Sequence, residues 1–203
     1  MTAIARNHAH TFIDLLYNDV DPINETAAIK YIDEYNDFYN TKINPWWSPL
    51  TYACNYGHEQ VAFKLMDVGA DINLITDKWT PLMFACYKSN VKIALELIRR
   101  GANINVKTND KNSAIILSCV KRNQSMVIML IDAGAEFVDI IDNHIIGYYN
   151  RKVMKYIRDK YRLCILAVID AEHTDTTVDN AMAACFRTTY AVELIDIISE
   201  FII

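Results

Sequence analysis

The chain has 203 residues, of which 52% are hydrophobic and 22% charged, and this balance is typical of a folded protein and not of a disordered one. Its formal net charge at pH 7 is −5, so it lacks the surplus of Lys and Arg that neutralises nucleic-acid phosphates, and we expect no nucleic-acid partner. No stretch approaches the roughly 18 apolar residues that a membrane-spanning helix needs, so we expect no membrane insertion.

The beginning of the chain, MTAIARNHAHTFIDLLYND, lacks the uninterrupted apolar run of a secretory signal, because His, Arg, Asn and Asp interrupt it. The five cysteines show no CxxC spacing, which favours reduced thiols. Both features predict a cytosolic protein. Two helices are predicted in this segment, over residues 9–18 and 25–39. The residues expected to pack them together are Phe12, Leu15, Leu16, Ile29 and Ile32.

Three blocks of the sequence superpose without gaps. They are SPLTYACNYGHEQVAFKLMDVGADIN from Ser48, TPLMFACYKSNVKIALELIRRGANIN from Thr80 and SAIILSCVKRNQSMVIMLIDAGAEF from Ser113. The first interval is 32 residues and the second is 33, and Gly69, Gly101 and Gly134 keep the same two intervals. A recurring period of this size indicates a stack of similar units.

Each block has the signals of two helices followed by a loop. Ser48, Thr80 and Ser113 carry hydroxyls suited to a helix N-cap, and in the first two blocks proline follows at the first helical position. The second helix of the first block places Val61 and Leu65 on one face and ends near Gly69. Because neither helix can bury its apolar face alone, the units are expected to stack as a solenoid.

The blocks TPLMFAC and GADIN resemble the ankyrin repeat, whose signature is TPLHxA. The resemblance covers about residues 43 to 138 and implies an all-α ankyrin-repeat solenoid of helix-turn-helix units with hairpin-like loops. Thr51, Met83 and Ile116 replace the histidine of the family, which leaves open whether neighbouring loops share the hydrogen bond that this histidine makes. The Asn, Ile, Lys and Tyr usage and the divergent repeats resemble ankyrin proteins of large DNA viruses or intracellular parasites, for which the compartment would be the host cytosol.

The repeat register predicts the domain boundaries. Solenoid ends need units with a polar outer face, so degenerate caps are expected at both ends. The predicted parts are a degenerate N-terminal repeat or cap over 1–43, repeats over about 44–75, 76–107 and 108–138, and a degenerate repeat with C-terminal capping helices over 139–203.

In the last part, KVMKYIRDKYR places Val153 and Ile157 where Val61 and Leu65 stand in the first repeat, which predicts a shortened fourth unit. Further helices are expected around 162–170, 177–187 and 189–201. The last of these has an apolar face formed by Val192, Ile195, Ile198 and Ile202. That face suits a cap, a helix that binds a partner, or self-association of an otherwise monomeric chain.

Cys54, Cys86 and Cys119 fall at the same repeat position, which suggests either a metal site or a buried slot. Equivalent helices in neighbouring units lie about 8–10 Å apart, whereas zinc needs sulfur atoms about 2.3 Å away, so the buried slot is favoured. A second candidate metal site is the acidic segment with Asp170, Glu172, His173, Asp175 and Asp179. Its spacing matches no calcium-loop or zinc pattern, so a solvated loop is favoured there.

The sequence contains no HExxH, no GxSxG and no glycine-rich phosphate loop. We therefore expect no enzyme activity, no cofactor and no metal.

The resemblance implies that a partner protein binds the concave face formed by the loop tips and the first helices. The residues of this chain that match such positions are Trp47, Asn55, Tyr56, Asp77, Trp79, Tyr87, Lys88, Asp110, Asn112 and Lys121. Trp and Tyr dominate interface hot spots, so Trp47, Tyr56, Trp79 and Tyr87 form a candidate anchor ladder. The alternative is that the two tryptophans only pack one loop against the next.

The run LMDVGADIN is similar to sites that asparaginyl hydroxylases modify in ankyrin repeats, so Asn73 is a possible hydroxylation site. The structural alternative is that Asn73 hydrogen-bonds across its own turn.

Taken together, these features predict a non-catalytic module that binds a partner protein through the concave ankyrin surface. The alternative is a targeting array whose C-terminal third recruits a second factor, for example a ubiquitin-ligase component, or mediates self-association.

Overall fold

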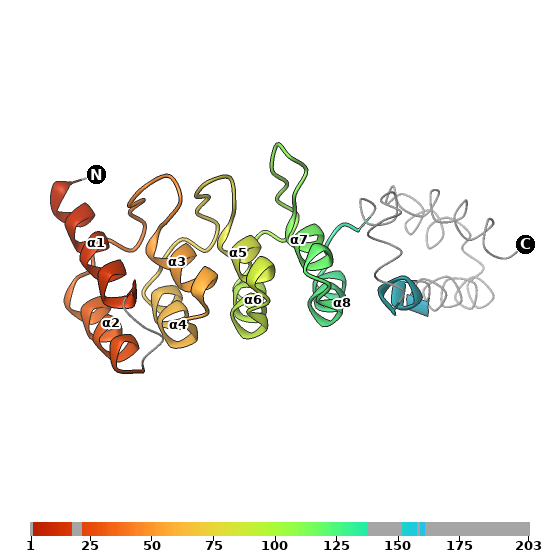
Figure 1. Cartoon of the computed structure of the whole chain (residues 1–203), viewed down its shortest axis with the longest axis horizontal. Coiled ribbons are helices and arrows are strands. Elements are labelled where there is room, and N and C mark those ends of the chain that lie inside the picture. Colours follow the sequence, from red (N-terminus) through yellow and green to blue (C-terminus); the bar gives the residue numbers. More distant parts are fainter. Residues whose placement is uncertain (1, 18–21, 138–151, 158, 161–203) are drawn as a thin grey trace, which may run out of the picture. The chain divides into compact units, whose positions relative to one another are not determined.

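A computed structural model describes residues 2–17, 22–137, 152–157 and 159–160. The chain divides into two units, Met1–Tyr149 and Asn150–Ile203, and each is described by itself. The first unit consists of helix pairs arranged in chain order (Figure 1). Its helices are α1 (Ala3–Tyr17), α2 (Pro22–Glu34), α3 (Pro49–Tyr56), α4 (Glu59–Asp67), α5 (Pro81–Lys88), α6 (Val91–Arg99), α7 (Ala114–Val120) and α8 (Gln124–Asp132).

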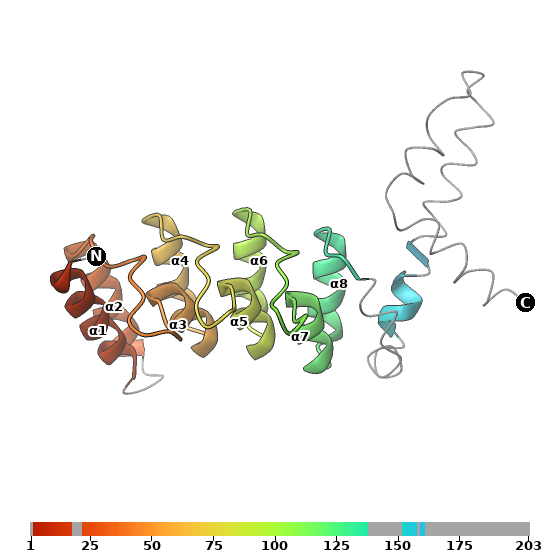
Figure 2. The same cartoon turned by 90° about the horizontal axis from the view of Figure 1, so that it is seen from above.

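The helices of the first unit form two layers (Figure 2). In the first-helix layer α1 packs on α3, α3 on α5 and α5 on α7, and in the second-helix layer α2 packs on α4 and α4 on α6. Long loops project from the first-helix layer between successive units (Figure 1). The described residues contain one isolated β-bridge and no strand, and the prediction of an all-α solenoid is confirmed. Among the same residues, no helix is both long enough and apolar enough to cross a membrane.

Hydroxyl side chains start the first helix of each repeat, as predicted. The hydroxyl oxygens of Ser48, Thr80 and Ser113 accept hydrogen bonds from backbone N–H groups in the first turn, at 3.3, 3.2 and 3.4 Å. A cap of this kind stabilises a helix by about 1 kcal/mol. The second helices end before Gly69, Gly101 and Gly134, whose φ angles of 88°, 87° and 93° let the chain turn toward the loop.

The amino-terminal pair differs from the prediction in its bounds. Helix α1 begins at Ala3, before residue 9, and α2 ends at Glu34, before residue 39. The chain turns after Tyr35 because Phe38 leaves the helical path to fill the core, where its ring lies 5.2 Å from that of Phe12. Among the expected packing residues, those that are buried are Phe12, Leu16 and Ile32, and those that are partly exposed are Leu15 and Ile29.

The hairpin turns explain why the repeat period changes from 32 to 33. In the second repeat Thr76 and Trp79 exchange two backbone hydrogen bonds around two residues with positive φ, Asp77 at 45° and Lys78 at 73°. This is the geometry of a two-residue hairpin turn. In the third repeat the bond from Thr108 N to Asn112 O, 2.9 Å long, encloses three residues. The additional residue of the third repeat therefore lies at the hairpin tip and leaves the helices in register.

Asparagines at one repeat position join neighbouring units. The Oδ1 atoms of Asn40, Asn73 and Asn105 accept hydrogen bonds from the backbone N–H groups of Asp71 (2.7 Å), Asn103 (2.8 Å) and Glu136 (2.8 Å). Asn73 bonds across its own turn through its backbone N–H, whereas its side-chain oxygen bonds to the next repeat. Asp71 Oδ1 accepts that local bond from Asn73 N at 2.9 Å, and Asn103 Oδ1 accepts the equivalent bond from Asn105 N at 3.1 Å.

A threonine pair makes one contact between repeats at a position where the family has histidine. Thr76 Oγ1 donates to Thr51 Oγ1 at 3.2 Å, and both side chains are buried. The first and second repeats therefore share a side-chain hydrogen bond at this position. Met83, which stands in the corresponding place of the second repeat, is buried and apolar.

In the second unit, residues 152–157 are helical, and Val153 and Ile157 are buried, as their correspondence to Val61 and Leu65 predicts. The helices expected around 162–170, 177–187 and 189–201 lie outside the described residues. So do the acidic segment from Asp170 to Asp179 and the predicted partner-binding or self-associating face of the last helix.

Candidate functional site

Six aromatic side chains form a continuous row across the first two repeats, which we call the aromatic strip. In order along the row they are Tyr56, Tyr52, Trp47, Phe84, Trp79 and Tyr87. Successive ring centroids lie 4.5, 5.6, 5.4, 5.2 and 5.1 Å apart. These separations are those of favourable tilted and edge-to-face aromatic pairs. The aromatic strip is therefore a packed feature of the first-helix side and not a set of isolated rings.

The repeat geometry places the two tryptophans. Trp47 and Trp79 each stand immediately before the N-cap residue of a first helix, so the end of each hairpin sets their rings beside that helix. The carbonyl of Trp79 accepts from Thr76 N at 3.0 Å, and the carbonyl of Trp47 accepts from Ile43 N at 2.9 Å. These hydrogen bonds hold the backbone of Trp47 and Trp79 in place and so position both side chains.

Phe84 joins the rings of the two repeats and was not among the predicted site residues. Its ring contacts both Trp47 and Trp79, and it is only 7% exposed. Tyr52 holds the same position one repeat earlier and is 4% exposed. Two aromatic residues 32 residues apart at one repeat position were a signal in the sequence that could have found them. Burial raises the pKa of Tyr52 to about 12, so its hydroxyl stays neutral at physiological pH.

The predicted anchor ladder combines packing with exposure. Tyr56 is 53% exposed, whereas Trp47, Trp79 and Tyr87 are half-buried. Trp46, which was not predicted, lies beside the aromatic strip in sequence and is 52% exposed. The tryptophans therefore pack against neighbouring rings and also present surface to solvent.

Two lysines flank the carboxyl-terminal end of the aromatic strip. Lys121 Nζ lies 3.8 Å from the ring centroid of Tyr87, and Lys88 Nζ lies 5.8 Å from it. Both side chains are exposed. In the part of the chain that the structure describes, neither ammonium group pairs with a carboxylate.

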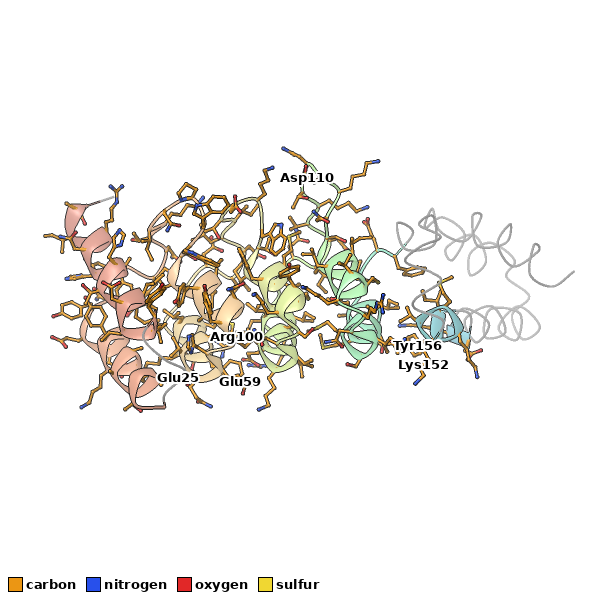
Figure 3. The ribbon with its side chains drawn as sticks, in the orientation of Figure 1. Glu25, Glu59, Arg100, Asp110, Lys152 and Tyr156 are labelled. Carbon is orange, nitrogen blue, oxygen red and sulfur yellow. The ribbon has the colours of Figure 1, made fainter. Side chains whose placement is uncertain are left out.

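The remaining predicted residues fall in different settings. Asp77 and Asp110 lie exposed at the hairpin tips, and Figure 3 labels Asp110. Asp110 Oδ2 is 3.5 Å from Lys78 Nζ. Asn112 is partly exposed at the base of the third hairpin. Asn55 is only 8% exposed, so its prediction as a contact residue is wrong, because the α3 turn that carries it faces the stack.

The repeated cysteines fill the buried slot that their spacing predicts. Cys54, Cys86 and Cys119 are free thiols and are at most 3% exposed. Burial raises the pKa of both Cys86 and Cys119 to about 12, so these thiols stay protonated. The described residues contain no group of three or more His, Cys, Asp or Glu side chains that could hold a metal ion.

Comparison with known proteins agrees with the repeated helix pairs of the structure. A family model described as ankyrin repeats in three copies matches residues 1–108 and residues 50–142. The chain belongs to the ankyrin-repeat family. Ankyrin repeats generally mediate protein–protein interaction, and the family is typically a non-catalytic binding module.

Among solved structures, 331 chains are similar to this ankyrin-repeat chain. One is the human ASB11 ankyrin repeat domain, with 27% sequence identity and a TM-score of 0.43. The similarity covers 44% of this chain and 41% of that structure, so the chain spans less than half of the length of this relative. No curated protein matches the chain.

Proposed function

We propose that this ankyrin-repeat chain holds a partner protein against the aromatic strip and acts as a non-catalytic adaptor. The observation that carries the proposal is the continuous row of rings from Tyr56 to Tyr87, in which Tyr52 and Phe84 are buried while the other four rings present surface to solvent. Large, rigid aromatic side chains give contact area at a low entropic cost, and they are frequent hot spots of interfaces.

The position of the aromatic strip also supports binding. It lies on the side from which the hairpins project, so a partner that contacts the rings also meets Asp77 and Asp110 at the hairpin tips. Rings from a hairpin and from a helix share this surface, and backbone hydrogen bonds hold the hairpins. Such a surface needs little reorganisation before binding.

The test compares exposed apolar residues on the two layers. Tyr56→Ala with Trp79→Ala removes two rings of the aromatic strip, whereas Val91→Ala with Leu95→Ala removes exposed apolar side chains of α6, which are 40% and 53% exposed. Each variant is first shown by circular dichroism to be folded. Proteins that copurify with each variant from cell extract, after crosslinking, are then quantified by mass spectrometry.

A hot-spot contribution of about 2 kcal/mol or more predicts that specific partners of the ring variant fall about 30-fold, with no change for the α6 variant. Equal recovery with both variants would place recognition elsewhere and refute the proposal.

A further inference from the structure

We propose that the partner segment bound along the aromatic strip is acidic at the end that lies over Tyr87, where Asp or Glu side chains pair with Lys88 and Lys121. This inference rests on the proposed function and assigns the chemistry of the partner. The carboxyl-terminal end of the aromatic strip is its cationic end, and an extended protein segment with apolar residues followed by carboxylates complements it.

The local charge around this end is opposite in sign to that of the whole chain. Exposed charged residues on the hairpins and first helices of the second and third repeats are the cations Lys78, Lys88, Lys111, Lys121 and Arg122 and the anions Asp77 and Asp110. The chain as a whole carries −5. A concentrated positive surface on a negative protein attracts anionic segments and accelerates their association.

The second-helix layer shows what cations do elsewhere in this fold. Lys92 Nζ lies 2.9 Å from Glu59 Oε2, and an Arg100 Nη atom lies 2.6 Å from Asp67 Oδ1, so cations of α6 and of its C-cap pair with carboxylates of α4. Figure 3 shows Glu59 and Arg100 along this layer. In that layer, charged side chains of neighbouring repeats neutralise one another's charge.

By contrast, the described residues offer no carboxylate to Lys88 or Lys121. Lys121 is held instead over the face of Tyr87, at 3.8 Å from the centroid. A cation placed beside an aromatic ring attracts a carboxylate while the ring contacts the apolar part of the same segment. Two cations without a carboxylate partner among the described residues, at one end of a row of rings, therefore predict that the bound segment is acidic at that end.

The ring geometry favours an acidic protein segment over single-stranded nucleic acid, which also combines negative charge with stacking. Bases stack on open aromatic faces. Here neighbouring rings are tilted by 36° to 79° and contact one another, and Lys121 covers one face of Tyr87. Edges and partly covered faces suit aliphatic and aromatic side chains better than a stack of bases.

The experiment selects random 12-residue peptides displayed on phage against the full chain. The same selection is made against Lys88→Gln with Lys121→Gln, and against the matched control Lys30→Gln with Lys92→Gln, which removes two positive charges from α2 and α6. We expect peptides from the full chain to be enriched in Asp and Glu next to apolar residues. The affinity of the best peptide, measured by tryptophan fluorescence, should fall about tenfold for the first variant and less than twofold for the control.

Three outcomes overturn the inference. The first is selection of neutral apolar peptides whose binding needs Tyr56 and Trp79 but not the two lysines, and this leaves the proposed function intact. The second is absence of any enriched peptide, after which the copurification test decides the proposed function by itself. The third is tighter binding of a single-stranded oligothymidylate than of the selected peptide.

Discussion

Phe84 is the side chain on which the continuity of the aromatic strip depends, and Phe84→Leu tests this directly. The change keeps an apolar residue on α5 but removes two ring contacts, at 5.4 Å to Trp47 and 5.2 Å to Trp79. Aromatic pairs of this kind contribute about 0.5–1.5 kcal/mol each beyond their buried area. The two contacts together predict a loss of about 1–3 kcal/mol in the free energy of unfolding.

Urea unfolding followed by tryptophan fluorescence measures this loss and also reports on the site, because all three tryptophans of the chain are Trp46, Trp47 and Trp79. The emission of the folded variant should change, since two of these rings lose a neighbour. Phe63→Leu on α4 is the control, because Phe63 makes no ring contact in the described part of the chain and should leave the emission unchanged. A loss below about 0.5 kcal/mol with unchanged emission for Phe84→Leu would refute the packed-strip interpretation.

Three further predictions concern the scaffold. Asn73→Ala removes the acceptor of the 2.8 Å bond from Asn103 N and should cost about 1 kcal/mol in urea unfolding, whereas no measurable cost would contradict the inter-repeat role. Hydrogen bonds from Arg99 and Arg100 lower the pKa of Glu96 from 4.5 to about 2. The ionised Glu96 carboxylate therefore contributes fully to the free energy of unfolding above pH 4.5, and this contribution is lost as the pH falls toward 2. The difference in the free energy of unfolding between wild type and Glu96→Gln should shrink between pH 4.5 and pH 2. Because burial raises the pKa of Cys86 to about 12, a thiol reagent should modify it at pH 8 only after urea is added, and rapid modification of the folded chain would show that the slot opens.

The stacked helices could be predicted because their signals are local and periodic. Hydroxyl N-caps such as Ser48 act within one turn, and the glycine after each second helix is needed for a positive φ. Both recur at the repeat period, so each repeat supports the interpretation of the next. The bounds of the amino-terminal helices were harder to predict, because this segment has the apolar spacing of a repeat but not its N-cap and glycine signals. Its second helix also ends early, before the buried residue Phe38.

The candidate site could be predicted only in part. Sequence position places Trp47 and Trp79 at hairpin ends, but it does not reveal that Phe84 lies between them, because that contact joins two repeats across the stack. The asparagine bonds were missed for the same reason: the backbone N–H that donates to Asn73 Oδ1 belongs to Asn103, 30 residues further along the chain. Contacts between units depend on how helix pairs stack, and a pattern within one repeat does not contain that information.

The question of whether the tryptophans pack or bind has a physical answer in their surroundings. A ring that is wholly exposed loses rotational freedom when a partner binds, and that loss weakens binding. Trp47 and Trp79 are half-buried against Phe84, so folding has already ordered them, and their exposed edges can contact a partner at a lower entropic cost. Packing and binding are therefore complementary here. A substitution that loosens the rings without removing them, such as Phe84→Leu, should weaken binding as well as folding.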